Sequence, residues 1–296
     1  MKPVQRAYLE LHFAVLLFGL TALLGGLIDL SAVNIVWWRV LLTSISLLFL
    51  IKLGEIRRIL PTKTILAMMG IGVIVGLHWV TFYGSVKLSN VSICLVGIST
   101  TSTFTAILEP LFFKEKIKWL EVGLSLLILP GMILVVNATD WSMLTGLWVA
   151  LISAFLAALF AIFNKKMITK IGALPITFIE LSSAWLFLSI VIPVYYLITL
   201  KPIELLPPRP IDWAYLVFLA LFCTTLAYVL ALRSLKYLSA FAANLTYNLE
   251  PVYGILLAWF ILKENEQLTT GFYIGAVIIM LAVFMYPVLK RRLVSE

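Results

Sequence analysis

The residues most suited to chemistry lie near the C-terminal end of the chain. They stand in the otherwise apolar stretch NLTYNLEPVYGILLAWFIL, residues 244–262. At its centre a carboxylic acid precedes a proline, Glu250 and Pro251. A carboxylate in the middle of a membrane-spanning helix is costly and usually marks function, and a proline there bends the helix. We therefore predict a coupling or gating role for this pair. The alternative is a Glu250 that only hydrogen-bonds an adjoining helix.

The same stretch carries a polar face that leads into the proline. Asn244, Tyr247 and Asn248 stand at positions i, i+3 and i+4, which lie on one side of an α-helix. Such a face can bind a small substrate, or it can hydrogen-bond a neighbouring helix and hold the bundle together. The spacing is compatible with both interpretations.

Other segments add further candidates for substrate binding. GLHWVTFYGS places His78, Trp79 and Tyr83 within two helical turns. Aromatic faces with a few polar atoms are typical of small-ligand sites, and a histidine can also carry protons; a histidine that only completes the packing is the alternative. The remaining candidates are hydroxyl groups, namely Ser99, Thr103 and Tyr228.

Three more charged residues interrupt apolar stretches: Arg39, Glu109 and Glu180. Long charged side chains near helix ends commonly extend to the membrane surface. For these three we expect such snorkelling or pairing with a local partner.

Sequence patterns for catalysis or metal binding are missing. The three aspartates, Asp29, Asp140 and Asp212, fall at loops or helix starts, and the two histidines, His12 and His78, do not have the spacing of metal ligands. The chain also contains no phosphate-binding P-loop motif. We therefore expect no enzymatic activity, no metal and no cofactor.

The composition indicates which environment holds these groups. Hydrophobic residues make up 62% of the 296 positions, against roughly 45–50% in soluble domains, and the mean hydropathy is +1.09. The net charge of +8 could suit a nucleic-acid partner, but the basic residues stand between apolar runs instead of on one soluble face. The chain is therefore predicted to be an all-α integral membrane protein in a lipid bilayer, without a nucleic-acid partner.

A membrane-spanning helix needs roughly 20 mostly apolar residues, and ten segments meet that length. With the N-terminus inside, 17 of the 22 Lys and Arg residues fall in cytoplasmic segments and four in outer loops. This asymmetry is typical of the cytoplasmic side, so we predict an inner (cytoplasmic) membrane protein with both termini in the cytoplasm. The expected spans are 7–27, 32–52, 64–86, 91–113, 118–137, 143–164, 174–199, 211–232, 240–262 and 268–289.

An internal repeat relates the two halves of the chain. A shift of 149 residues aligns residues 85–116 with residues 234–265 without a gap; in each copy Ser-x-Lys precedes an apolar helix and Lys-Glu follows it. Five predicted helices separate the copies, and because five is odd they cross the membrane in opposite directions. The prediction is two inverted five-helix repeats, 1–140 and 141–296, the arrangement that in many transporters encloses a site near the midplane.

The pattern LSAFAANLTYNLEPVYGILLAWFILKENE, together with the similar Glu-closed helix in the first half, resembles the ten-helix EamA branch of the drug/metabolite transporter superfamily. One departure concerns the first half, where Thr101 and Ser102 align with Glu250 and Pro251, so the two halves are expected to bend unequally.

The resemblance implies a secondary transporter that exports amino acids or related small metabolites through a central cavity. Multidrug or cationic-compound efflux is one alternative, and a membrane scaffold or sensor without flux is another. A monomer and a homodimer are both compatible with the sequence.

Overall fold

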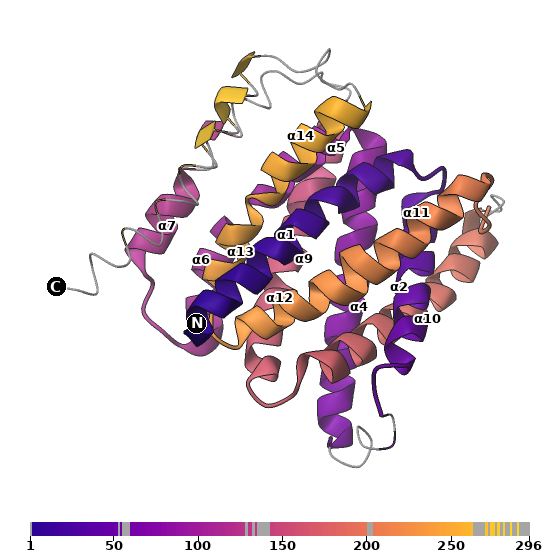
Figure 1. Ribbon diagram of the computed structural model, residues 1–296, viewed down its shortest axis with the longest axis horizontal. Helices are drawn as coiled ribbons and strands as arrows, with labels where there is room; N and C mark the ends of the chain where they lie inside the picture. Colours follow the sequence, from indigo (N-terminus) through magenta and orange to yellow (C-terminus); the bar gives the residue numbers. More distant parts are fainter. Residues whose placement is uncertain are drawn as a thin grey trace.

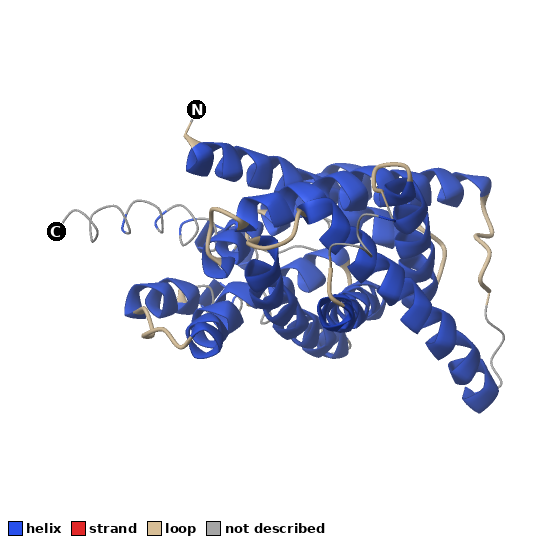
Figure 2. Ribbon diagram, turned by 90° about the horizontal axis from the view of Figure 1, so that it is seen from below, coloured by secondary structure: helices blue, strands red, loops and turns tan. Residues whose placement is uncertain are grey.

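The structure is a computed structural model, and it describes residues 2–52, 54, 60–127, 130, 131, 134, 143–199, 204–262, 270, 271, 273–275, 277, 278, 281, 285 and 289. The described chain consists of helices and connecting loops, without a strand (Figure 2). This confirms the predicted all-α class.

The helices follow one another in chain order with short connections. The first half contains α1 Pro3–Leu27, α2 Ala32–Leu48, α4 Thr62–Leu88, α5 Val91–Ser99, α6 Thr101–Phe113 and α7 Trp119–Leu126. The second half contains α9 Leu144–Ile168, α10 Ala173–Thr199, α11 Pro210–Ala220, the π-helical segment η2 Leu221–Leu226, α12 Ala227–Leu235, α13 Ala240–Tyr247 and α14 Glu250–Leu262.

Within these described residues, six helical stretches are long and apolar enough to cross a membrane, and the 17-residue α2 is a shorter apolar helix. Two of the six are composite, α5 with α6 and α11 with η2 and α12. Most of the predicted spans 118–137 and 268–289 lie outside the described residues. Membrane-spanning helices are therefore present, while the count of ten stays a prediction.

Both halves interrupt a helix at matching positions. In the first half α5 ends at Ser99 and α6 begins at Thr101. In the second half α13 ends at Tyr247, 148 residues after Ser99, and α14 begins at Glu250, 149 residues after Thr101. The first break has no proline. Instead, four consecutive hydroxyl side chains each donate to the carbonyl three residues earlier, which offers the backbone an alternative to the helical ladder: Ser99, Thr100, Thr101 and Ser102. The two halves therefore break a helix at matching positions, but with different residues: hydroxyl side chains in the first half and Glu250 with Pro251 in the second.

The helices of the two halves are interleaved. Figure 1 shows α1 lying between α14 and α12, and it contacts both. In the same way α4 packs against α9 and α10 of the second half. A central space bounded by α1, α4, α9, α12 and α13 is therefore lined by side chains from both halves.

The described residues reverse the polarity of a soluble protein. Large apolar side chains face outward, for example Phe49, Trp119 and Leu197, whereas Arg39 and Glu180 are buried. Since lipid tails accept apolar side chains but cannot satisfy polar ones, this distribution fits a bilayer as the surrounding solvent. These two buried charged residues, Arg39 and Glu180, therefore lie inside the bundle.

Helices α4 and α10 touch at Gly72, where a Cβ atom would collide with the Glu180 carbonyl oxygen and the Ser183 hydroxyl. We expect Gly72→Ala to force the helices apart and to lower the midpoint of thermal unfolding in detergent, equivalent to about 1–3 kcal/mol as in other overpacked cores. Gly70→Ala is the matched control, because a Cβ there would meet nothing within 4 Å. Equal midpoints for the two variants would contradict this close packing.

Candidate functional site

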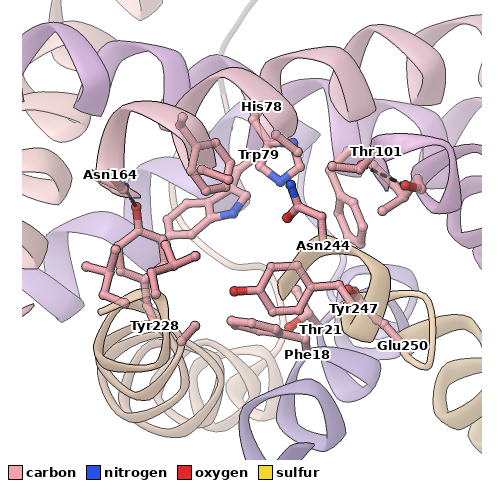
Figure 3. A pocket seen from close by; sticks show the side chains of 18 of the residues that line it. Phe18, Thr21, His78, Trp79, Thr101, Asn164, Tyr228, Asn244, Tyr247 and Glu250 are labelled. Carbon is pink, nitrogen blue, oxygen red and sulfur yellow. Dashed lines mark hydrogen bonds between the residues drawn. The ribbon is translucent and has the colours of Figure 1, made fainter. Parts of the chain in front are cut away.

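A cavity lies in the central space, and Figure 3 shows the side chains of Trp79, Tyr228, Asn244 and Tyr247 around it. Its wall is mostly aromatic and aliphatic, with a few polar groups and two charged residues, the mixture that is typical of a small-ligand site. The wall consists of Phe18, Thr21, Arg39, His78, Trp79, Phe82, Ile98, Thr101, Ala157, Phe160, Ala161, Asn164, Tyr228, Ala231, Leu232, Leu235, Asn244, Tyr247, Asn248 and Glu250.

Six of the nine predicted substrate-binding residues line this cavity: His78, Trp79, Tyr228, Asn244, Tyr247 and Asn248. The other three lie elsewhere. Tyr83 is fully buried and its hydroxyl accepts from Arg39. The Ser99 hydroxyl donates to the Val96 carbonyl of its own helix, and the Thr103 hydroxyl donates to the Ser125 carbonyl on α7. Whether the six bind substrate stays a prediction; the structure brings them together.

His78 both completes the packing and lines the cavity. Its Nδ1 lies 2.9 Å from the Ser153 carbonyl oxygen on α9, and the Ser153 hydroxyl donates to the His78 carbonyl at 2.8 Å. The Ser153 hydroxyl oxygen also lies 2.8 Å from Nδ1, so this side of the ring is occupied by Ser153. The ring still lines the cavity, and the two interpretations of His78 are compatible with each other.

Arg39 is buried in the wall instead of extending to the membrane surface. It is 1% exposed, and its Cζ lies 3.9 Å from the centroid of the Trp79 ring. Its Nε donates to Thr224 Oγ1 at 2.6 Å and its two terminal nitrogens donate to the Tyr83 hydroxyl at 3.0 Å and the Cys223 carbonyl at 3.2 Å. Of the two expectations for Arg39, snorkelling is therefore wrong, and the groups that pair with it at depth come from other helices.

The π-helical segment η2 provides two of these contacts. The Thr224 and Thr225 hydroxyls donate to carbonyls five residues earlier, at 2.7 and 3.0 Å. A π-turn widens the helix and changes the direction of its carbonyl groups, and such turns are frequent at functional sites. Here the widened turn provides the Cys223 carbonyl as an acceptor for Arg39. Nothing in the hydrophobic pattern of residues 211–232 indicated it.

Aromatic side chains surround the rest of the cavity. Trp79 and Tyr228 meet edge to face at 6.0 Å between ring centroids, and Phe18 and Tyr247 do so at 5.7 Å. Such pairs resist rotation and add roughly 0.5–1.5 kcal/mol beyond their burial. The cavity wall is therefore rigid and apolar between its polar groups.

Two asparagines, Asn244 within α13 and Asn248 at its C-terminal cap, connect this helix to α6. Asn244 Nδ2 donates to the Thr105 hydroxyl at 2.7 Å, and Asn248 Nδ2 donates to the Ser102 hydroxyl at 3.1 Å. The bonds support the packing interpretation of this polar face. Both residues also line the cavity. They therefore lie where the α6–α13 contact meets the cavity.

Glu250 is the first residue of α14, and it reaches the cavity beside Tyr247 (Figure 3). It is 8% exposed, and its carboxylate has no hydrogen bond or ion pair to any residue that the structure describes. Pro251 occupies the first turn of α14, where a missing N–H has no intrahelical partner to lose. The kink expected inside one helix is thus a break between two helices.

The opposite end of α13, its N-terminus, is held by a clasp, which we define as Glu109, Lys165 and the α12–α13 connection. Glu109 Oε1 and Oε2 accept from the backbone N–H groups of Ala240 and Phe241 at 3.0 and 2.7 Å. Lys165 Nζ donates to the carbonyls of Leu235 and Leu238 at 2.7 and 2.5 Å. Glu109 is 7% exposed. It therefore caps a helix, and the expected snorkelling is wrong for it as well.

The cavity is also lined by residues that the sequence did not indicate as binding candidates, including Phe18, Thr21, Thr101 and Asn164. An asparagine within the apolar run LFAIFNKK could have drawn attention to Asn164. The others have the residue types of ordinary membrane helices, and only the packing brings them to the cavity.

Sequence comparisons agree with this architecture. The EamA-like transporter family matches residues 5–137 and again residues 144–286. The chain is also similar to the uncharacterized transporter YdfC of Bacillus subtilis (strain 168), with 24% identity over 254 residues that cover 82% of this chain and 78% of the relative.

A solved structure, described only as the crystal structure of a protein, has the same fold. It covers 97% of this chain and 98% of its own, with a TM-score of 0.70 and 14% identity. The two family matches together span most of the chain. This protein therefore belongs to the EamA-like transporter family of multi-pass membrane proteins.

Proposed function

We propose that this protein is a secondary transporter that exports amino acids or closely related zwitterionic metabolites across the cytoplasmic membrane. One observation carries the proposal: Arg39 and Glu250 line the same cavity without forming an ion pair with each other. A ligand with a carboxylate and an ammonium group could satisfy both.

The details of Arg39 support the carboxylate half of this assignment. A guanidinium has five N–H donors, and three of them have acceptors in the described chain. Two donors are left for a substrate carboxylate, and charge-assisted bonds of this kind are among the stronger polar contacts. A carboxylate there would also neutralise the buried cation.

Glu250 supports the ammonium half. Its carboxylate has no described partner, and the Tyr247 and Phe18 rings line the same cavity (Figure 3). An ammonium group is attracted both by a carboxylate and by the faces of aromatic rings. The apolar wall between Arg39 and Glu250 would contact the side chain of the substrate.

Alternating access between two inverted repeats, 1–140 and 141–296, is the transport mechanism that we propose, with both termini in the cytoplasm. The matched breaks after α5 and α13 support it, because interrupted helices near a midplane site are typical of such carriers. The excess of Lys and Arg in the segments predicted to face the cytoplasm supports the orientation.

The test is a mass-spectrometric efflux screen on the purified protein in liposomes, with and without a pH gradient. The liposomes are loaded with amino acids, with the matching amines that lack the carboxyl group, and with the matching acids that lack the amino group. We expect amino acids to leave roughly tenfold faster or more than either analogue, since one lost charge-assisted bond costs about 1.5–3 kcal/mol.

Two outcomes would contradict the proposal. Preferential export of the amines, or of a lipophilic cation such as tetraphenylphosphonium, would indicate cationic-compound efflux. The absence of flux for every compound, in liposomes that contain correctly folded protein, would favour the scaffold or sensor alternative.

A further inference from the structure

A second buried carboxyl group lies just outside the cavity wall. Glu180 on α10 is fully buried, and its Oε2 accepts from the Tyr228 hydroxyl at 2.7 Å and from Asn164 Nδ2 at 3.2 Å. Asn164 Nδ2 also lies 3.2 Å from the Tyr228 hydroxyl oxygen. Three helices, α9, α10 and α12, therefore meet in one polar cluster inside an apolar bundle.

This cluster has acceptors that lack donors. Glu180 Oε1 and Asn164 Oδ1 are both buried, and neither has a hydrogen-bond partner among the described residues. Buried polar atoms are nearly always paired, so two unpaired acceptors in one cluster point to a missing donor. A proton bound to Glu180 Oε1 is the smallest donor that fits, and it converts that oxygen from an acceptor into a hydroxyl group.

The charged groups of the neighbouring helices are engaged elsewhere. On α2, Arg39 bonds to Thr224, Tyr83 and Cys223; on α4, the His78 ring bonds to Ser153; and on α9, Lys165 bonds to backbone carbonyls. The titratable group of α12 at the cluster is Tyr228 itself, which donates to Glu180. No cation in the described chain forms an ion pair with Glu180, and an isolated carboxylate away from water is costly.

Glu180 is connected to the cavity through its two partners. Tyr228 and Asn164 line the cavity, whereas Glu180 does not. With Glu180 ionised, the Tyr228 hydroxyl is held as a donor to the carboxylate. With Glu180 protonated, that hydroxyl and the Asn164 amide can turn towards a ligand. The state of Glu180 thus changes which hydrogen bonds the cavity offers.

We propose that Glu180, with Asn164 and Tyr228, is the proton-binding site that couples export to the proton gradient, and that Glu250 contacts the substrate. In this scheme Glu180 takes a proton from the water on one side of the membrane and releases it to the other, while Tyr228 keeps its own proton. The coupling role rests on the proposed function, but proton binding by Glu180 can be tested without any substrate.

The first experiment measures proton binding directly. Infrared difference spectra between low and high pH, recorded on the purified protein in lipid, report buried carboxyl groups through a C=O band that exchanges slowly in heavy water. We expect such a band to be lost completely in Glu180→Gln, to shift in Tyr228→Phe and to persist in Glu250→Gln. A band that is unchanged in correctly folded Glu180→Gln would overturn the assignment.

The second experiment measures coupling with the amino acid that the efflux screen identifies. In Glu180→Gln we expect exchange between equal pools to proceed, while accumulation driven by a pH gradient is lost completely. Glu250→Gln is the contrasting variant, in which we expect exchange itself to slow roughly tenfold or more, as for one charge-assisted bond.

The two proposals can fail separately. The coupling role alone is overturned if accumulation driven by a pH gradient survives in Glu180→Gln. It is also overturned if transport is driven by a sodium gradient and does not respond to pH. A wild-type protein that exchanges no amino acid overturns the proposed function. If Glu180→Gln unfolds, Tyr228→Phe is measured in its place, because it removes one of the two connections and leaves the carboxyl group; an infrared band that does not shift in this variant would then overturn the assignment.

Discussion

Replacing Arg39 with Met is expected to raise the KM for amino-acid export by roughly 10- to 100-fold, the equivalent of one charge-assisted hydrogen-bonded contact. Met replaces the apolar stem of the side chain but lacks the guanidinium that lies over Trp79. Initial rates of exchange in liposomes across a range of substrate concentrations provide the measurement. Export of the amine that lacks the carboxyl group serves as the internal reference, because it should change little.

Arg39→Lys is the matched control for charge. A lysine keeps the positive charge but cannot reproduce the three-way contact of the guanidinium with Thr224, Tyr83 and the Cys223 carbonyl. We expect its KM to fall between those of the wild type and the Met variant. Equal losses for the amino acid and for the amine would contradict carboxylate recognition and would assign Arg39 a purely structural role.

Opening the clasp should have the second large effect. In Glu109→Ala, the backbone N–H groups of Ala240 and Phe241 lose their acceptors. Two buried donors without partners should lower the free energy of unfolding by about 2–4 kcal/mol, which thermal unfolding in detergent would show. The α12–α13 connection would then separate from α6, and a cavity-lining Ala161→Cys should react faster with a thiol reagent.

Glu115→Ala is the control for the loss of a nearby carboxylate. Glu115 forms an exposed pair with Lys118 at 3.1 Å, and such pairs contribute roughly 0–1 kcal/mol. The native thiols, Cys94 and Cys223, are buried, so the background labelling should be low. If Glu109→Ala labels at the wild-type rate and unfolds at the wild-type temperature, the clasp does not hold this end of the bundle closed.

Several features follow from local sequence alone. The span expected at 91–113 coincides with α5 and α6 together, and that expected at 174–199 coincides with α10 to within one residue. A hydrophobic stretch of membrane length forms an α-helix in lipid, because its backbone N–H and C=O groups must bond to one another within the segment. The motifs around Glu250 were likewise sufficient to identify the family.

Other features depend on which helices meet, and the sequence contains no such information. Local sequence does not place Arg39 at the cavity, because its partners are 44 to 185 residues away, on α4 and η2. The same holds for Glu180, since Tyr228 lies 48 residues further along the chain. A charged residue in an apolar run has the same local pattern whether it snorkels or lies beside a cavity.

The sequence by itself therefore determined the bilayer, the helical class, most of the helix boundaries and the polar face of Asn244, Tyr247 and Asn248, all of which depend on residues near one another in the chain. The tertiary structure decided that Arg39 and Glu250 line one cavity, that Glu180 reaches it through Tyr228 and Asn164, and that Glu109 caps α13. The physical reason is that a buried charge is stabilised by donors and acceptors from other helices, and only packing brings those groups within hydrogen-bond distance.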